Sequence, residues 1–403
     1  MAGMSAAEQY KILAENTAEI IVEEEFKKKL EKSVAENKPL RCKLGIDPSA
    51  PDLHLGHAVV LHKLRQFQEL GHHVIIILGD FTGMVGDPTG RSETRKQLTV
   101  EEVLANARTY QDQIFNILDP DRTELVFNSE WLAKLTFADV IKLASTLTVA
   151  RMMEREDFSK RYAENIPISI HEFFYPLMQG YDSIAIRADI EFGATEQKFN
   201  LLMGRQLQRE YGQEPQVAFT MPILVGTDGV QKMSKSLGNY IGITEPPEEI
   251  YGKAMSIGDD LMPEYFRLAT SLSSTEVNAI LDDLKNDKLH PRDAKMRLAR
   301  EIVALYHGAE AATAAEERFK QVFQKGEIPT EMPAYAFNGP TNIINAMLDS
   351  NLAPTKSEAR RLIQQNGVKI DGETVTSIEL ELTAGLAAVL QVGKRKFVRI
   401  NIT

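Results

Sequence analysis

Five consecutive apolar residues at positions 74–78 (VIIIL) constrain the fold more than any other part of the sequence. A run that is apolar at every position is typical of a strand buried on both faces, as in a parallel sheet covered by helices. The preceding residues fit this interpretation, because 40–46 read as a short strand and about 56–70 as an amphipathic helix. Strand, helix and strand with short connections form a parallel βαβ unit, which predicts an α/β fold.

The rest of the chain has mainly helical patterns, and its 403 residues exceed one ordinary core, so we expect two or three domains. A capping box at Ser273 and Glu276 begins one helix, and Gly308 is placed to end a helix that starts at Pro291. We expect an amphipathic helix over 5–35, mostly helices over 100–182 and 246–325, and a further strand over 183–187.

The last part of the chain has a different character. Residues 325–340 contain three prolines and two glycines and read as a linker. Residues 340–403 hold eight Lys or Arg against six Asp or Glu, although the whole chain has a net charge of −11. A helix capped by Thr355 and two hairpin turns, at Asp371-Gly372 and Gly393-Lys394, predict a small α+β module with its own partner.

Composition excludes several classes of protein. Cys42 is the only cysteine, so internal disulfides and cysteine-rich metal sites are excluded. The sequence has no apolar stretch long enough to span a membrane and no secretory signal. We therefore expect a cytoplasmic protein that does not bind membranes and has no resident metal site.

A histidine pair marks the start of the predicted helix at 56–70. His54 and His57 are three residues apart and lie on one face of the first turn, while Gly56 lets a ligand approach the backbone. A helix N-terminus that directly follows a parallel strand is a favourable place for phosphate. By itself, the motif is also explained by two histidines at a solvated helix start.

A second motif, KMSKS at residues 232–236, is flanked by Gly229 and Gly238. Lys232 and Lys235 are three residues apart and could neutralise a triphosphate and its leaving pyrophosphate. A basic surface loop explains this pentapeptide equally well when it is taken alone.

Together and in this order, the two motifs resemble the HIGH and KMSKS signatures of class I aminoacyl-tRNA synthetases. From about residue 35 to the end, the chain resembles bacterial tyrosyl-tRNA synthetases. The resemblance implies a doubly wound, Rossmann-like parallel sheet with a helical insertion, then a helical anticodon-binding domain and a small α+β S4-like RNA-binding domain. The expected divisions are a helical segment (1–35), the catalytic domain (36–245), the anticodon-binding domain (246–325), a linker (326–340) and the S4-like domain (341–403).

The residues predicted to hold the amino acid include a polar stripe on a helix. Tyr175, Gln179 and Asp182 share one helical face, which by itself would suit an exposed polar surface. In the resembled family, the position of Asp182 accepts the phenolic O–H of tyrosine and the other matching positions surround the ammonium group. A buried acceptor also distinguishes a phenol from phenylalanine, a case for which the tyrosyl enzyme is a standard example. The resemblance assigns tyrosine binding to Lys43, Thr82, Asp87, Tyr175, Gln179, Asp182 and Gln197.

The position of Lys43 more often carries a tyrosine in the family, so Lys43 could bond to the phenol or pair with Asp182. Ala194 and Glu196 also depart from the family segment Gly-Gly-Ser/Thr-Asp-Gln, which predicts shifted or water-mediated ribose contacts. The resemblance assigns catalytic roles to Ser49, His54, His57, Lys232, Lys235 and Ser236, and ATP contacts to Asp47, Gly56, Gly193, Glu196 and Lys235.

The tail residues predicted to bind tRNA lie on a basic helix edge and in a hairpin. The resemblance implies activation of tyrosine by ATP with Mg²⁺, transfer to tRNA(Tyr), and a homodimer. A tryptophanyl enzyme is the nearest alternative, but Asp182 suits a phenol better than an indole. A nucleotidylyltransferase has no use for the tail, and a non-catalytic RNA-binding relative should lack the phosphate-binding residues. The predicted tRNA contacts are Lys356, Arg360, Arg361, Lys394, Arg395 and Lys396.

Overall fold

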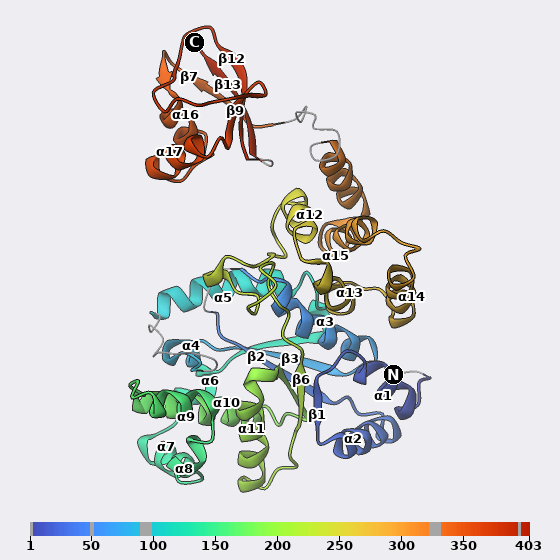
Figure 1. Ribbon diagram of the computed structural model, residues 1–403. Coiled ribbons are helices and arrows are strands. Elements are labelled where there is room, and N and C mark those ends of the chain that lie inside the picture. Colours follow the sequence, from blue (N-terminus) through green and yellow to red (C-terminus); the bar gives the residue numbers. More distant parts are fainter. Residues whose placement is uncertain (1–2, 49–51, 89–98, 322–331, 394–395) are drawn as a thin grey trace. The chain divides into compact units, whose positions relative to one another are not determined.

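The computed structural model describes the chain except for residues 1–2, 49–51, 89–98, 322–331 and 394–395 (Figure 1). The chain divides into two compact units, Met1–Tyr306 and His307–Thr403, and each is described by itself. The α/β fold predicted from the sequence is confirmed in the first unit.

Within the described residues, six strands of the first unit form one sheet in the order β1-β6-β5-β2-β3-β4. The strands from β6 to β4 are parallel, and β1 is antiparallel at the edge. The bounds are β1 Glu19–Ile21, β2 Arg41–Ile46, β3 His73–Leu78, β4 Thr123–Phe127, β5 Ile190–Ala194 and β6 Val217–Met221.

The order of the strands reverses beside β2. The chain runs outward from β2 to β3 and β4, and then returns to place β5 on the other side of β2. Ligands of open parallel sheets bind outside the carboxyl ends of the strands at such a reversal. The expected site is therefore next to the ends of β2 and β5.

Helices cover both faces of this sheet. Figure 1 shows α3 on one side and α10 and α11 on the other. On the α3 side, the ring of Phe67 packs edge-on against Phe192 and Phe219, at 5.0 and 5.7 Å between centroids. These helices and the shorter ones between them are α3 Leu55–Glu69, α4 Thr82–Val85, α5 Val100–Ile114, α6 Ser129–Leu132, α7 Phe137–Ala144, α8 Val149–Met152, α9 Glu156–Ala163, α10 Phe174–Ala185 and α11 Lys198–Glu210.

The predicted single helix over residues 5–35 is wrong. The structure has α1 (Ala6–Ala14), then β1, then α2 (Glu23–Glu36). Asn16 has φ 55°, a left-handed conformation that ends the first helix, and β1 then pairs with β6. The acidic and basic residues on both sides have a helical period that hides so short a strand.

The predicted strand over residues 183–187 is also wrong, because α10 continues to Ala185 and the strand β5 begins only at Ile190. Arg187 has φ 51° and turns the chain between them. The expectation of mostly helix over 100–182 holds except for β4.

The predicted helices after residue 246 are confirmed. Ser273 caps α14 through the backbone N–H of Glu276, and Gly308 interrupts α15 with φ 86° and ψ 165°. A positive φ needs glycine, so the sequence placed this break correctly. The bounds are α12 Pro247–Met255, α13 Met262–Leu268, α14 Ser274–Lys285 and α15 Pro291–Phe319.

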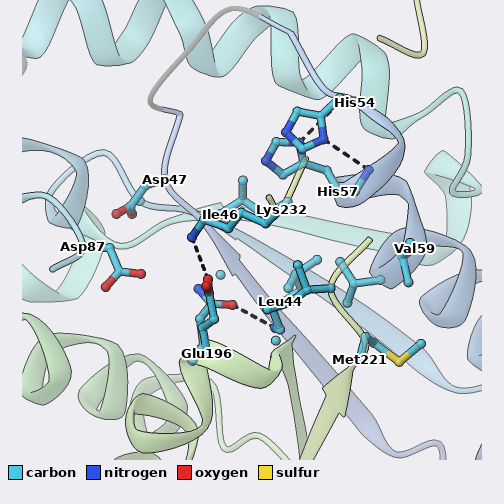
Figure 2. Close-up of a pocket in the computed structure, with 18 of the residues that line it drawn as sticks. Leu44, Ile46, Asp47, His54, His57, Val59, Asp87, Glu196, Met221 and Lys232 are labelled. Atoms are coloured by element: carbon cyan, nitrogen blue, oxygen red, sulfur yellow. Dashed lines mark hydrogen bonds and ion pairs between the residues drawn. The ribbon is translucent and has the colours of Figure 1, made fainter. Parts of the chain in front are cut away.

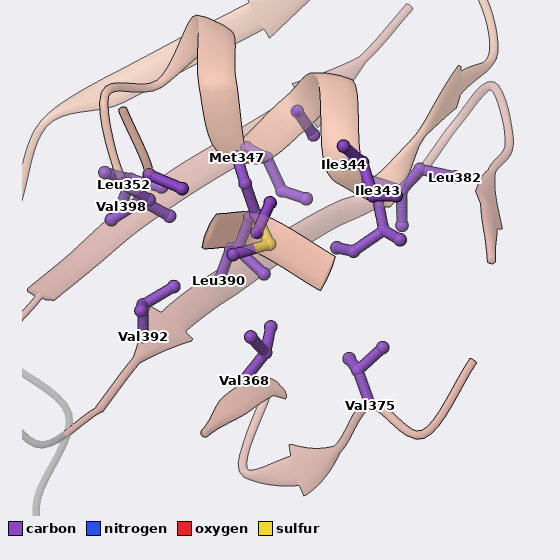
Figure 3. Packing of buried hydrophobic residues seen from close by; sticks show 14 of the residues in the cluster. Ile343, Ile344, Met347, Leu352, Val368, Val375, Leu382, Leu390, Val392 and Val398 are labelled. Atoms are coloured by element: carbon purple, nitrogen blue, oxygen red, sulfur yellow. The ribbon is translucent and has the colours of Figure 1, made fainter. Parts of the chain in front are cut away.

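The second unit contains a sheet in the order β10-β9-β12-β13-β7 and two short helices. Met347, Leu390 and Val398 belong to its apolar core, which Figure 3 shows from close by. The bounds are β7 Ala334–Phe337, β8 Thr341–Asn342, α16 Ile343–Asp349, α17 Lys356–Gln364, β9 Val368–Ile370, β10 Glu373–Thr374, β11 Glu381–Leu382, β12 Ala387–Val392 and β13 Lys396–Ile402.

The predicted linker over 326–340 is wrong for residues 334–337, because β7 pairs in parallel with β13. The turn at Asp371-Gly372 is confirmed, with φ 48° and 90° between β9 and β10. The second predicted turn joins β12 and β13, but Lys394 and Arg395 lie outside the described residues.

The edge strand β7 should therefore stabilise the second unit. Tyr335 and Phe337 pack against its core, and burying two aromatic side chains in part is worth about 2–4 kcal/mol. We expect a fragment of residues 332–403 to unfold at a clearly higher urea concentration than a fragment of residues 341–403. Equal midpoints in urea titrations followed by circular dichroism would contradict this role of β7.

Candidate functional site

A cavity of about 430 Å³ opens at the carboxyl ends of the parallel strands, a size typical of small-ligand sites (Figure 2). The residues that line it follow the strands directly: Asp47 after β2, Thr82 after β3, Asn128 after β4 and Glu196 after β5. The cavity therefore lies at the reversal of strand order, where the topology places a ligand.

The two histidines lie together at the N-terminus of α3, with ring centroids 3.9 Å apart. His54 Nδ1 accepts the backbone N–H of Gly56 at 3.1 Å, and His57 Nδ1 accepts that of His54 at 3.3 Å. Burial lowers the pKa of His54 to about 2 and that of His57 to about 4, and Lys235 adds to both shifts. Both imidazoles are therefore neutral at pH 7, and each carries its proton on Nε2 as a donor.

Backbone pairing brings the two sequence motifs together. The N–H of Leu55 donates to the carbonyl of Ile241 at 2.9 Å, and the N–H of Ile243 donates to Leu53 at 3.2 Å. Met233, within KMSKS, is buried, and a Cβ on Gly56 would lie 3.7 Å from it. The histidine motif and the lysine loop thus form one wall of the cavity.

Each lysine of the loop makes an ion pair across the cavity. Lys232 Nζ lies 2.7 Å from Glu196 Oε2, which Figure 2 shows, and Lys235 Nζ lies 2.6 Å from Asp52 Oδ2. Both lysines line the cavity beside the histidines, so this end is rich in cations and neutral N–H donors.

The opposite part of the cavity is acidic. Asp47 accepts from the Thr82 hydroxyl through Oδ1 and from the Tyr175 hydroxyl through Oδ2, both at 2.7 Å. Burial, then the nearby Asp47, Asp87 and Asp182, raises the pKa of Tyr175 well above its usual value. Three carboxylates therefore face one buried phenol, an arrangement suited to a cation.

Asp182 is held from two sides. Its Oδ1 accepts the indole N–H of Trp131 at 2.7 Å, and its Oδ2 accepts from the Asn128 amide at 3.3 Å. Burial raises the pKa of Asp182 to about 7, although Lys43 and these two donors act in the opposite direction. A carboxylate has further lone pairs, so Asp182 can still accept a ligand hydroxyl.

The sequence missed three residues of this site: Asp52, Asn128 and Trp131. Asn128 directly follows β4, so recognising that strand would have placed it at the cavity edge. Ser49 lies outside the described residues. The predicted residues that line the cavity are Asp47, His54, Gly56, His57, Thr82, Asp87, Tyr175, Gln179, Asp182, Gly193, Glu196, Gln197, Lys232, Lys235 and Ser236.

The predicted contact of Lys43 with the ligand or with Asp182 is not what the structure shows. Lys43 is fully buried behind the cavity wall, and its Nζ donates to the Gln179 carbonyl, Ser183 Oγ and Glu191 Oε1 at 2.7–2.9 Å. An ammonium has three protons, and all three are used here.

Comparisons with known proteins agree with this geometry. Residues 35–324 match the model of class I tRNA synthetases (W and Y), and residues 323–400 match the SYY-like C-terminal domain of tyrosine–tRNA ligases. The chain is 62% identical to the tyrosine–tRNA ligase of Moorella thermoacetica, over 98% of this chain and 96% of that one. It is 56% identical to that of Geobacter sulfurreducens, over 99% and 100%.

The chain belongs to the tyrosine–tRNA ligase family of class I tRNA synthetases.

Solved structures show the same fold for this synthetase. The tyrosyl-tRNA synthetase of Archaeoglobus fulgidus, complexed with L-tyrosine, is 25% identical with a TM-score of 0.63, covering 77% of this chain and all of that one. A C-terminally truncated mitochondrial tyrosyl-tRNA synthetase of Aspergillus nidulans gives a TM-score of 0.64 at 23% identity, over 80% and 95%.

In the tail of this synthetase, the predicted basic residues Lys356, Arg360 and Arg361 lie exposed on α17, and Lys396 is exposed at the start of β13. Arg361 is held by Glu358 through Nη2 at 2.6 Å. The structure thus places these cations on the surface, while Lys394 and Arg395 lie outside the described residues.

Two searches of the described parts of the chain found nothing. No three His, Cys, Asp or Glu side chains there come together as metal ligands, and the expectation of no resident metal stays a prediction. None of the helices in these parts is both long and apolar enough to cross a membrane.

Gly79 should be essential to the acidic part of the cavity. A Cβ on Gly79 would lie 2.0 Å from Asp47 Oδ1 and 2.3 Å from Thr82 Oγ1, and so would break their hydrogen bond. We expect Gly79→Ala to lower the rate of ATP–pyrophosphate exchange by about 10-fold or more, because small displacements of positioning groups are costly. Gly83→Ala is the control, since its Cβ meets only ordinary contacts at 3.6–3.8 Å. Equal loss in the two variants would refute the specific role.

Proposed function

We propose that this chain activates L-tyrosine with ATP and then transfers it to tRNA(Tyr). One observation carries the proposal: a single cavity has three carboxylates at one part and two lysines with two neutral histidines at the other. An amino acid presents an ammonium group, and ATP presents a triphosphate, so the two parts match the two substrates in charge. Family membership supports the same reaction.

The amino acid is proposed to bind with its ammonium group among Asp87, Tyr175, Gln179 and Thr82. Its phenol then reaches Asp182, which Asn128 and Trp131 orient. Asp47 bonds to both Thr82 and Tyr175, so it connects the amino-acid residues to the loop that leads to the histidines. Gln197 accepts from the N–H of Ala194 at 3.0 Å and lines the same wall.

The nucleotide is proposed to bind along Gly56, Gly193 and Glu196, with its phosphates at the N-terminus of α3. In the first step the tyrosine carboxylate attacks the α-phosphorus in line, and pyrophosphate leaves. In the second step a terminal ribose hydroxyl of tRNA attacks the activated carbonyl, and AMP leaves. Magnesium enters as part of the nucleotide substrate. A side-chain nucleophile is not needed, so catalysis rests on positioning and on charge stabilisation.

The histidines and lysines are proposed to act on the leaving pyrophosphate. Neutral imidazoles donate N–H bonds from Nε2, and the lysines supply positive charge. Lys232 and Lys235 would exchange their present carboxylate partners for phosphate oxygens. Ser236, whose Oγ lies 2.9 Å from that of Ser234, and Ser49 are proposed to assist.

The choice of amino acid is the direct test. We expect tyrosine to drive ATP–pyrophosphate exchange, with tryptophan and phenylalanine weaker by several orders of magnitude. Asp182→Ala should lower kcat/KM for tyrosine and reduce the preference over phenylalanine, because the buried acceptor is lost. Exchange driven best by tryptophan would identify the alternative specificity and overturn the proposal.

His54 should act mainly in the transition state. We expect His54→Ala to lower kcat for adenylate formation by about 10²–10³-fold, with little change in the KM for tyrosine. His62→Ala is the matched control: it lies on the same helix but bonds to Tyr306 at 3.0 Å and not to the cavity. A normal single-turnover rate in His54→Ala would exclude the role.

The second unit is proposed to bind tRNA through its exposed cations, Lys356 and Arg360 among them, because phosphate contacts supply most of the affinity for nucleic acid. The other described part of that surface is Arg361 and Lys396, and Lys394 and Arg395 are proposed to join it. The helical segment from α12 to α15 is proposed to bind the anticodon.

The chain is also proposed to form a homodimer in the cytoplasm. An exposed apolar surface between α7 and the start of α10 supports the dimer, since patches of this kind mark interfaces. Phe137 is 81% exposed there, and Tyr162 is 74% exposed. The other members of this surface are Ile141, Val149 and Ile170.

A further inference from the structure

Lys43 and Glu191 form an ion pair that is completely buried beneath the cavity, with 2.9 Å between Nζ and Oε1. Removing two charges from water is costly, and a sheet interior filled with apolar residues would usually be at least as stable. A pair kept in this position therefore suggests a task besides stability. Its surroundings indicate what that task is.

The pair is joined directly to the stripe on α10 that lines the amino-acid part of the cavity. Lys43 Nζ donates to the carbonyl of Gln179 at 2.8 Å and to Ser183 Oγ at 2.7 Å. Glu191 Oε1 accepts from the amide Nε2 of Gln179 at 3.0 Å. Asn200 donates to the Oε1 of the same amide at 3.0 Å. The side chain and main chain of Gln179 are thus both fixed.

The network leaves little room for rearrangement. Glu191 Oε2 accepts from Ser183 at 3.2 Å and from Gln216. A Cβ on Gly204 of α11 would lie 3.0 Å or less from all three of these side chains. The ion pair is therefore enclosed between β2, β5, α10 and α11, and water cannot screen its field.

We propose that Lys43 is a positioning residue for tyrosine recognition: its buried ammonium fixes Gln179 and keeps Asp182 in the carboxylate form. Lys43 does not touch the substrate in this role. The inference rests on the proposed function for its consequence in tyrosine binding, but its electrostatic part concerns the free protein.

The charged and polar groups around Asp182 come from each element packed against it. Burial opposes the ionised form and raises the pKa of Asp182 to about 7. Lys43 on β2 acts against burial, as do Trp131 and Asn128 beyond β4, and Glu191 on β5 acts with burial. Tyr175 faces Asp182 from the same helix. Lys43 is the cation of this set, so its loss should leave Asp182 protonated at neutral pH.

Trp131 makes this measurable without any substrate. It is the only tryptophan in the chain, and its indole N–H donates to Asp182 Oδ1 at 2.7 Å. Tryptophan emission should therefore change as Asp182 gains or loses its proton. In the wild type we expect one transition with a midpoint near the pKa of about 7, and Asp182→Asn should abolish it.

The decisive variant is Lys43→Met. We expect its emission midpoint to rise by about one pH unit or more, because an opposite charge has been removed. The matched control is Lys29→Met, which removes another buried lysine, paired with Glu214 at 2.8 Å away from the cavity. Its midpoint should equal that of the wild type. An unchanged midpoint in folded Lys43→Met would overturn the proposal.

A double variant covers the case in which Lys43→Met does not fold. Lys43→Met with Glu191→Gln removes both charges and keeps an amide in place of the carboxylate. Lys43 acts on Asp182 more strongly than Glu191 does, so the midpoint should still rise, though by less. A midpoint at or below that of the wild type would reject the proposal.

Tyrosine affinity gives a separate result. Equilibrium dialysis should show Lys43→Met binding tyrosine about five-fold more weakly at pH 7, since a smaller fraction of Asp182 is ionised, with a smaller deficit at pH 9. An equal deficit at both pH values would reject the electrostatic role. If the wild type bound no tyrosine, the proposed function would fail, and the emission experiment would still test Lys43.

Discussion

The position of β2 between β3 and β5 is the constraint on which the whole site depends. Hydrogen bonding aligns Cys42 with Val74 on one side and with Ile190 on the other, so three strands end at one edge. The chain leaves β2 toward α3 and returns later through α10 to β5. Groups distant in the sequence, such as Asp47 and Glu196, therefore meet at that edge. A change of register by one residue would turn Asp47 away from Thr82 and Tyr175.

The two faces of the same sheet have different tasks. On the α3 side, Phe67, Phe192 and Phe219 pack edge to face without polar groups. On the α10 side, the alternating positions of β2 and β5 carry Lys43 and Glu191, and the helices supply their partners. The aromatic side stabilises the sheet. The polar side fixes the orientation of α10, which apolar packing alone would leave less strictly defined, and so transmits order to the amino-acid part of the cavity.

The sequence predicted those elements whose burial leaves a continuous or periodic pattern, and missed the others for physical reasons. The run in β3 is buried at every residue, and it was recognised at once. In β4 only part of each side chain is covered, so no clear period marks it, and Asn128 and Trp131 were missed with it. The charged motifs were found because their residue types carry the chemistry. The place of Lys43 was not, because burial and partners are properties of the fold.

The ion pairs of the KMSKS loop explain how the same lysines can be ordered and yet available. Lys232 is 42% exposed and its partner Glu196 34%, while Lys235 is 21% exposed and Asp52 49%. Pairs with this much access to water contribute about 0–1 kcal/mol, because solvent screens them. Exchanging such a carboxylate for a phosphate oxygen therefore costs little. The buried Met233 anchors the loop in the meantime, so the loop keeps its place beside the histidines without the strong pairing that would block the nucleotide.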